Sequence, residues 1–327
     1  MNILVTGGAG YIGSHMLKVL SKLGHSVVCL DNLSTGHKEF AMYGEFINCD
    51  LANKALLKDV FDKFSFDAVV HFAAYSQVAE SMENPGKYYR NNVTNTQNLL
   101  DVMVDFNVTS IVFSSTAAIF GNPEYSPIDE NHIKSPINPY GRTKLAIEYM
   151  LNDYEIAHGI KSVSLRYFNA AGADPDGEIG ERHIPETHLI PLVLQVASGE
   201  REEISIFGSD YNTNDGTCIR DYIHVLDLCE AHVLAINWLK NNGNSRQYNL
   251  GNGTGFSVKQ VIDTSIKVTG KSIPIVIANR RPGDPDELIA NSSLIMQELD
   301  WTPKYNSLED IITHAWRWEV KENRRKL

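Results

Sequence analysis

Tyr140 and Lys144 are the residues of this chain whose types and spacing most directly suggest chemistry. A separation of four residues puts a phenol and an ammonium on one face of a helix, ~6 Å apart along its axis. Pro139 favours a first helical turn at this point. A free phenol has a pKa of ~10, and a nearby cation or a helix N-terminus favours the phenolate. The pair could therefore accept and return a proton, or it could simply be exposed on a helix.

Three hydroxyl side chains, Ser114, Ser115 and Thr116, follow an apolar run that predicts a strand over residues 110–114. In open parallel sheets, ligands bind beyond the carboxyl ends of the strands. One of these hydroxyls could therefore hold a substrate oxygen. The alternative is that they cap a turn.

A glycine-rich segment from Thr6 to Gly13 follows the first expected strand and opens the first expected helix. Gly7 would permit the sharp turn, Gly10 would let the backbone approach a pyrophosphate, and Gly13 would allow close packing of the helix. The helix N-terminus would stabilise the anion. The segment predicts a dinucleotide site, the alternative being a tight strand-to-helix turn.

Asp31 ends the second expected strand, at the distance from the glycines where dinucleotide-binding folds place an acidic residue. Its carboxylate could accept hydrogen bonds from both ribose hydroxyls. A 2′-phosphate would be repelled there, and residues 32–40 contain no arginine to offset the repulsion. NAD is therefore favoured over NADP, unless Asp31 only caps a helix.

The first 170 residues alternate short β-branched runs with amphipathic stretches, as parallel strands joined by helices do. Strands are expected at residues 2–6, 26–30, 45–48, 68–72, 110–114 and 162–166. Helices are expected at residues 12–23, 53–64, 85–105 and 139–158. This α/β pattern predicts a doubly wound, Rossmann-like parallel sheet with right-handed crossovers.

The sequence changes character over residues 172–185, which are rich in Gly, Pro and Asp and lack periodicity, as in a loop. Downstream, helices are expected at residues 188–199, 225–240, 257–269 and 307–320, and strands at 203–207, 247–250 and 273–277. We expect residues 1–170 to form an NAD-binding domain, with residues near 219–240 packing back onto it. Residues 171–327 would mainly form a smaller α/β substrate lobe.

Composition excludes several classes of function. With 327 residues, 43% of them hydrophobic, the chain can bury a sizeable core, and its net charge of −11 disfavours nucleic acid and anionic membranes as partners. The four cysteines lack C-x-x-C spacing, so no metal site is expected. No targeting or transmembrane pattern is visible, which predicts a cytoplasmic protein.

Taken in order, the glycine segment, the hydroxyl after the fifth strand and the Tyr-x-x-x-Lys pair resemble the extended short-chain dehydrogenase/reductase superfamily over nearly the whole chain. Within it, the chain resembles the bacterial UDP-glucose 4-epimerase family through longer segments. These are TGGAGYIGSH from Thr6, NNV from Asn91, FSSTAA from Phe113, LRYFNAAGA from Leu165, DGTCIRDYIHV from Asp215 and RRPGD from Arg280.

The resemblance implies inversion at C4 of UDP-galactose or UDP-glucose through a transient 4-keto sugar, with NAD bound and not consumed. It implies that Tyr140 is the base and acid at O4, that Lys144 holds the nicotinamide ribose and tunes the phenol, and that Thr116 hydrogen-bonds O4. These are the three implied catalytic residues.

The resemblance also implies which residues bind NAD. They are Gly7, Gly10, Tyr11, Ile12, Gly13, Asp31, Asn32, Asp50, Leu51, Phe72, Ala73, Ala74, Asn91, Ser114, Tyr140, Lys144 and Tyr167. Asp50 would meet the adenine, unless it caps the helix at residues 53–64. Phe72, Ala73 and Ala74 would run under the pyrophosphate, unless they are packed core.

For the UDP-sugar, the implied contacts are Thr116, Tyr140, Asn169, His188, Leu189, Arg220, Arg281 and Asp284. Arg220 and Arg281 would grip the phosphates, because a planar guanidinium can bind phosphate through two hydrogen bonds. The alternative for either arginine is a surface ion pair.

Two departures from the family pattern bear on specificity. Ser76 stands where some relatives have Lys, which predicts a looser grip on NAD. Leu288 stands where sugar-selective relatives have Tyr, which leaves room beside the hexose 2-substituent. We therefore expect UDP-N-acetylglucosamine and UDP-N-acetylgalactosamine to be accepted as well.

Other functions of related proteins are compatible with the sequence to different degrees. Ala117 and Ala118 stand where sugar-nucleotide dehydratases and decarboxylases need acidic residues. A UDP-glucuronate 4-epimerase, an NAD-dependent dehydrogenase of the same superfamily and a non-catalytic dinucleotide sensor stay open. The helices at residues 85–105 and 139–158 resemble those that pair in family homodimers, although they could also cover the sheet of a monomer.

Overall fold

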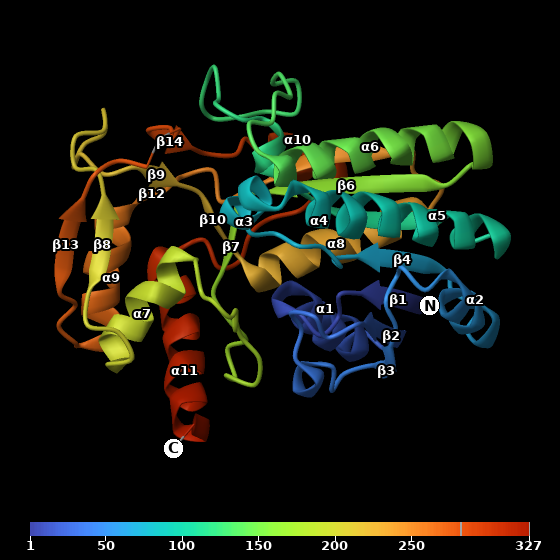
Figure 1. The fold of residues 1–327 in the computed structure, drawn as a ribbon, viewed down its shortest axis with the longest axis horizontal. Helices are drawn as coiled ribbons and strands as arrows, with labels where there is room; N and C mark the ends of the chain where they lie inside the picture. Colours follow the sequence, from blue (N-terminus) through green and yellow to red (C-terminus); the bar gives the residue numbers. More distant parts are fainter. Residues whose placement is uncertain (282, 327) are drawn as a thin grey trace.

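A seven-stranded sheet forms the centre of the larger part of the molecule (Figure 1). The computed structural model describes residues 1–281 and 283–326. Across the sheet the strands are β11 (Arg246–Leu250), β6 (Lys161–Tyr167), β5 (Ser110–Thr116), β4 (Ala68–His71), β1 (Asn2–Thr6), β2 (Ser26–Asp31) and β3 (Glu45–Asn48). Neighbouring strands are all parallel, so the α/β class and the Rossmann-like sheet are confirmed.

Helices cover both faces of this sheet (Figure 1). One face carries α1 (Tyr11–Lys22), α8 (Val225–Lys240) and α10 (Ser293–Leu299), and the other carries α2 (Lys54–Lys63), α5 (Asn95–Asp105) and α6 (Pro139–His158). Side chains alternate between the two cores: Ile3 and Val5 pack under α1 and α8, whereas Leu4 packs under α2 and α5. Burial on both faces explains why these strands are apolar at successive positions.

Helix α6, which carries Tyr140 and Lys144, has the bounds expected from the sequence. Asn138 caps it by accepting a 2.8 Å hydrogen bond from the Gly141 amide, Pro139 opens its first turn, and Gly159 ends it in the left-handed conformation. These three signals are local, and they fix where the Tyr-Lys face begins.

The single helix expected at residues 85–105 is instead interrupted. It consists of α4 (Pro85–Tyr88), a π-helical turn η2 (Tyr89–Thr94) and α5. Asn92 in the π turn is buried and binds the backbone of Tyr75 and the hydroxyl of Thr143. The wider turn lets this side chain reach inward, as π turns at functional positions commonly do.

A smaller lobe holds β8 (Ile204–Phe207) and β13 (Ile275–Ala278), a parallel pair packed with α7 (Leu189–Ser198), α9 (Val258–Thr269) and α11 (Leu308–Lys326) (Figure 1). The sequence did not predict several short elements. They are η1 (Lys38–Phe40), α3 (Val78–Glu83), η3 (Ala117–Ile119), α10, β7 (Asn169–Ala171), β9 (Ile219–Arg220), β10 (Tyr222–His224), β12 (Phe256–Ser257) and β14 (Glu287–Leu288).

The strand expected near residues 247–250 lies in the large sheet and not in the smaller lobe. It is β11, which pairs with β6 in a register that puts Tyr248 beside Leu165. Tyr248 and Leu250 are fully buried under α8 and α10, and this burial fixes the strand at the sheet edge. The polypeptide therefore leaves the sheet after β6 and returns to it.

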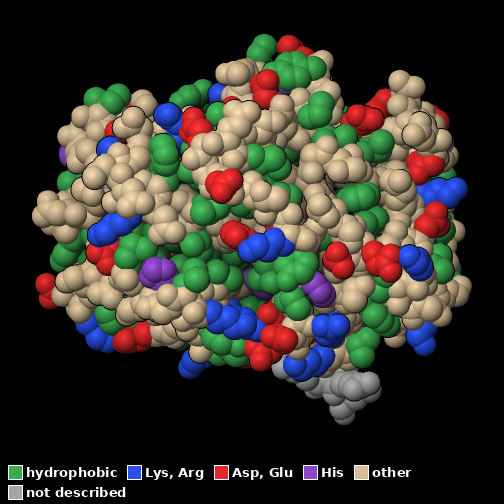
Figure 2. Space-filling model, turned by 180° about the vertical axis from the view of Figure 1, so that it is seen from behind, with side chains coloured by type: hydrophobic (Ala, Val, Ile, Leu, Met, Phe, Trp, Pro, Cys, Tyr) green, Lys and Arg blue, Asp and Glu red, His purple; other side chains and the backbone are tan. Residues whose placement is uncertain are grey.

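Charged side chains on the surface are mixed. Figure 2 shows acidic and basic side chains interspersed over the described part of one face, rather than gathered into one basic region. Among the described helices, none combines the length and the apolar character needed to cross a membrane.

Candidate active site

The glycine segment forms a cradle of backbone atoms between β1 and α1. Gly7 adopts φ +70°, and a Cβ there would lie 2.6 Å from the Ala73 nitrogen. A Cβ on Gly13 would lie 2.1 Å from the Gly7 carbonyl oxygen. No side chain caps the N-terminus of α1, and its first turn holds no acidic residue. The cradle therefore suits an anion held by backbone amides, such as a pyrophosphate.

Asp31 lies at the carboxyl end of β2 and is buried. Its two oxygens accept hydrogen bonds from the amides of Ala9 (3.0 Å) and Leu33 (2.8 Å), and burial raises the pKa of the carboxyl group while these bonds oppose the rise. It does not cap a helix. The carboxylate instead fixes the glycine segment, and its remaining lone pairs can accept further hydrogen bonds.

Asn32 and Asp50 meet at the next strand end. Asn32 Nδ2 donates to Asp50 Oδ2 (2.8 Å), while Asp50 Oδ1 accepts from the Ala52 amide (2.8 Å). Asn53, rather than Asp50, caps α2. Asn98 Nδ2 holds the carbonyl of Leu51 at 3.0 Å. These contacts order the loop after β3.

Phe72, Ala73 and Ala74 follow β4 directly, and the Ala73 backbone closes one side of the glycine cradle. Phe72 packs against His232 of α8, so the alternative of packed core also holds for its ring. The sequence reasoning missed Asn92, which ties this segment to α6. A buried amide with backbone partners leaves no periodic signal, although Asn92 lies within the NNV segment that resembles the family.

Of the remaining expected cofactor residues on the α1 and η2 segments, Tyr11 donates its hydroxyl to the Gly172 carbonyl (2.7 Å), and Ile12 packs against the core under α1. Asn91 donates to Asn92 Oδ1 (3.0 Å). Only the backbone of Tyr11 therefore faces the cradle region, because its phenol is tied to the loop after β7.

The expected catalytic set, Thr116, Tyr140 and Lys144, lies near the carboxyl ends of β5 and β6. Lys144 is 2% exposed and donates to the Ser114 carbonyl (2.7 Å), with its ammonium 6.0 Å from the Tyr140 ring centre. The Ser114 and Tyr167 hydroxyls bind each other. Thr116 Oγ1 accepts from the Ala118 amide (3.1 Å), which confirms its local turn contact, and it also hydrogen-bonds Tyr140.

The charges at this site differ from those inferred from the helix spacing. Burial raises the pKa of Tyr140 to about 12, and the hydrogen bond with Thr116 only partly opposes it. Burial lowers the pKa of Lys144 to about 7, opposed by Glu148. Burial therefore keeps the phenol protonated near neutral pH and leaves the Lys144 side chain only partly charged there.

A cavity of about 350 Å³ opens beside these strand ends. Its lining includes all of the expected substrate contacts outside the catalytic set: Asn169, His188, Leu189, Arg220, Arg281 and Asp284. Thr116 and Tyr140 are not among the described lining residues. The cavity begins where β6 passes into β7, so it extends the carboxyl edge of the sheet into the smaller lobe.

Both arginines face this cavity. Arg220 donates to the carbonyls of Ile219 (2.8 Å) and Pro285 (3.0 Å) and lies 3.4 Å from Asp284 Oδ1, so the ion-pair alternative is partly correct. Arg281 lies 3.9 Å from the centre of the Phe207 ring. Pro282, within the same RRPGD motif, lies outside the described residues.

Ser76 and Leu288, the two positions that depart from the family pattern, differ in solvent exposure. Ser76 is exposed. Leu288 is half-buried in β14 and packs, as Ala117 does, against a cluster of Ile119, Phe120, Ile128 and Leu145.

Residues 3–251 match the family described as the NAD dependent epimerase/dehydratase family. The UDP-glucose 4-epimerase of Halalkalibacterium halodurans is 54% identical over 318 residues, covering 97% of this chain and 95% of that protein. The crystal structure of UDP-glucose 4-epimerase from Brucella ovis in complex with NAD has a TM-score of 0.95 and 48% identity, and covers 97% of this chain and 98% of that one.

A third similar protein is the UDP-Glc/GlcNAc 4-epimerase of Campylobacter jejuni, whose structure has a TM-score of 0.86 and 45% identity. It covers 98% of this chain and 99% of that one. Together with the geometry of the glycine cradle and the Tyr-Lys pair, these similarities establish that the chain belongs to the NAD-dependent epimerase/dehydratase family and, within it, to the UDP-glucose 4-epimerases.

Proposed function

We propose that this protein interconverts UDP-galactose and UDP-glucose by inverting C4 of the hexose, with NAD held throughout turnover. One observation carries the proposal: Thr116, Tyr140 and Lys144 meet at the carboxyl end of β5. Strand β5 lies between β4, which closes the glycine cradle, and β6, which leads into the arginine-lined cavity. A cofactor and a nucleotide sugar placed on these two sides would meet at Tyr140.

In this proposal Tyr140 takes the proton of the C4 hydroxyl and later returns it, while Thr116 hydrogen-bonds the same oxygen. NAD, when bound, supplies the hydride acceptor at C4 and the hydride donor that acts on the other face of the 4-keto sugar. Because hydride and proton both return to the sugar, the reaction consumes no reductant. A phenol with a pKa of about 12 needs a nearby positive charge to ionise, and an oxidised nicotinamide and Lys144 are the cations of this site.

The cofactor half of the proposal depends on backbone shape. Gly7, Gly10 and Gly13 give the pyrophosphate access to the amides at the start of α1, and Asp31 accepts the ribose hydroxyls with its remaining lone pairs. We propose that the remaining residues that the resemblance assigns to NAD also contact the cofactor. We assign this binding to residues 1–170 together with α8 and β11, and substrate binding mainly to residues 171–327.

The substrate half depends on charge. Arg220 and Arg281 supply local positive charge for the UDP pyrophosphate in a chain whose net charge is −11. Asn169, His188, Leu189 and Asp284 line the same cavity and would position the nucleotide.

The test is to incubate the purified protein separately with UDP-galactose, UDP-glucose and UDP-glucuronate and to separate the products by chromatography. We expect the first two to interconvert without net NADH release. Stoichiometric NADH release would favour a dehydrogenase, conversion of UDP-glucuronate alone would favour the acidic-sugar epimerase, and binding of NAD without turnover would favour a sensor.

A wider sugar range is proposed from Leu288, because leucine lacks the ring and hydroxyl of tyrosine at a position that packs on the same cluster as Ala117, the residue after Thr116. The relative from Campylobacter jejuni, by its name, acts on both types of sugar. We expect UDP-N-acetylglucosamine to be converted and Leu288→Tyr to lose this conversion while keeping that of UDP-galactose. A wild-type protein that converts UDP-galactose but never the N-acetyl sugar would disprove the idea.

We also propose that the protein is a cytoplasmic homodimer. Ile156 on α6 is 78% exposed and Tyr89 on η2 is 42% exposed, so the helices on this face present apolar side chains to solvent. The four cysteines are unpaired, which suits a reducing compartment. Light scattering should give the mass of two chains, and Ile156→Asp should shift it towards one.

A further inference from the structure

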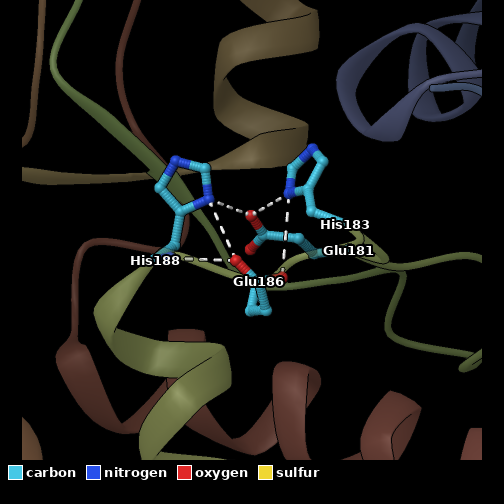
Figure 3. A group of neighbouring side chains, drawn as sticks. All are labelled: Glu181, His183, Glu186 and His188. Carbon is cyan, nitrogen blue, oxygen red and sulfur yellow. Dashed lines mark hydrogen bonds and ion pairs between the residues drawn. The ribbon is translucent and has the colours of Figure 1, made fainter. Parts of the chain in front are cut away.

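Four potential metal ligands converge in the loop before α7. Glu181, His183, Glu186 and His188 each offer one atom, and these atoms all lie within 4.8 Å of one another. Figure 3 shows both imidazoles directing a nitrogen towards the two carboxylates. The cysteine spacing, on which the expectation of no metal site was based, carries no information about such a group.

The separations suit a tetrahedral ion. His183 Nδ1 lies 3.1 Å from Glu181 Oε1 and 3.7 Å from Glu186 Oε2, and His188 Nδ1 lies 2.6 Å from Glu181 Oε1 and 3.4 Å from Glu186 Oε1. Zn²⁺ binds His nitrogen and carboxylate oxygen at ~2.0–2.2 Å, which places neighbouring ligand atoms ~3.3 Å apart. Small side-chain rotations would therefore bring one atom of each residue to bonding distance.

A second observation is that one of the two buried carboxylates, Glu181, has an oxygen without a well-aligned hydrogen bond, whereas Glu186 accepts from the amides of Thr187 (2.7 Å) and His188 (2.9 Å). The side chains of Glu181 and Glu186 are each 6% exposed. Glu181 Oε1 and His183 Nδ1 are buried and make no well-aligned hydrogen bond in the described part of the chain, although they are close. Buried charges are costly unless they are paired or coordinate a metal.

We propose that Glu181, His183, Glu186 and His188 form a binding site for a divalent cation of the zinc type, with two imidazole and two carboxylate ligands. Imidazole with carboxylate is a common zinc donor set. The site adjoins the substrate cavity, which His188 lines, and reaches α1, where the His183 ring contacts that of Tyr11. A bound ion would fix the loop between them.

The competing arrangement is a closed network of ion pairs. Burial lowers the pKa of both imidazoles, but the two carboxylates outweigh it and raise the pKa of His183 to about 9 and that of His188 to about 10, so without an ion both imidazoles hold a proton. A divalent cation would replace these two protons and leave the charge of the group unchanged. The two arrangements therefore differ in metal content and not in charge.

The experiment measures metal on the full-length protein. After treatment with EDTA and removal of the chelator, the protein is equilibrated with Zn²⁺, dialysed, and analysed by mass spectrometry for zinc per chain. In parallel, Co²⁺ is titrated in and the visible absorption of tetrahedral cobalt is followed. We expect one ion per chain, and His183→Gln and Glu186→Gln should each weaken binding by about tenfold or more.

His314→Gln is the matched control. It removes one imidazole from the other close histidine pair, in which His224 Nε2 lies 3.0 Å from His314 Nδ1, and it should leave the zinc content unchanged. Circular dichroism shows whether each variant is folded, and the cobalt spectrum of the unchanged chain answers the question even if one variant fails. Absence of bound zinc and of a tetrahedral cobalt spectrum, or equal binding by the wild type and both ligand variants, would overturn the proposal. None of these readings depends on epimerase activity.

Discussion

The cofactor side and the substrate side of the site are built in opposite ways. On the cofactor side the closest approaches are between backbone atoms, as where Gly13 meets the Gly7 carbonyl. On the substrate side, side chains such as Arg220 and Arg281 project into a cavity from separate segments. The first kind of site constrains the backbone, and the second constrains individual side chains.

This difference implies different tolerance to change. A methyl group added to the cradle has no space, because its neighbours are main-chain atoms that cannot rotate away. A side chain lining the cavity can change without moving the backbone. Sugar range can therefore diverge while the cofactor side is retained.

The largest effect is expected at Tyr140, where the two sides meet. Tyr140→Phe should lower kcat by about 1,000-fold, because the proton acceptor at O4 is lost, while bound NAD is kept. Tyr149→Phe, on the exposed face of the same helix, is the control and should be fully active. The measurement is conversion of UDP-galactose together with the NAD content; wild-type turnover by Tyr140→Phe would remove the proposed base.

Gly13→Ala tests the backbone constraint. Its Cβ would lie 2.1 Å from the Gly7 oxygen, so the variant should lose NAD, and its free energy of unfolding should fall by about 3 kcal/mol. Gly86→Ala, whose Cβ would meet only the flexible Arg90 side chain at 3.3 Å, should differ little from wild type. The measurements are denaturant unfolding and NAD content, and equal behaviour of the two variants would show that backbone packing at Gly13 does not limit NAD binding.

Arg281→Ala tests the side-chain constraint. It should raise KM for UDP-galactose by about 10- to 100-fold, because one positive contact to phosphate is removed, and it should leave NAD content unchanged. Arg280→Ala is the control, since the Arg280 side chain pairs with Asp210 at the surface and is not among the cavity-lining residues. The measurement is KM for UDP-galactose from steady-state kinetics. A larger rise in KM for Arg280→Ala than for Arg281→Ala would show that the phosphates bind elsewhere.

The smallest expected effect is a change in the free energy of unfolding of Lys144→Met. The size of this change depends on pH. Burial lowers the folded-state pKa of Lys144 to about 7 from its ordinary 10.5, so the unfolded chain binds one more proton between these values. Stability of the wild type therefore falls as pH drops from 10.5 to 7. The variant lacks this cost but also loses the hydrogen bond to the buried Ser114 carbonyl, which offsets part of the gain, so it should be more stable at pH 7 by about 1–2 kcal/mol.

The measurement is denaturant unfolding at pH 7 and pH 9, with turnover recorded separately because loss of Lys144 should also slow catalysis. Lys58→Met, at an exposed position, should show the wild-type dependence on pH. If the wild type and Lys144→Met change equally between the two pH values, the ammonium is not destabilised by burial.

Local signals account for what the sequence could predict. The bounds of α6 and α8 follow from caps and periodicity, and the glycine segment follows from conformations that only glycine can adopt. The resemblance to the family added the six cavity residues outside the catalytic set, whose segments lie far apart in the sequence.

Long-range contacts account for what could not be predicted. Strands of two or three residues, such as β7 and β9, are too short for any periodicity and form only because distant partners lie beside them. The pKa values of Tyr140 and Lys144 depend on burial, which spacing along a helix does not reveal. Likewise, nothing local shows that Glu181 and His188 face each other.

The position of β11 has a consequence for synthesis. A nascent chain that has emerged only as far as residue 170 contains neither β11 nor α8, so the outer edge of β6 and the apolar side chains of Val163 and Leu165 have nothing to cover them. Such an intermediate is expected to need chaperones on the ribosome. For the same reason, cutting the gene at that codon would not release a self-sufficient dinucleotide module, and the two lobes cannot be exchanged between relatives as independent cassettes.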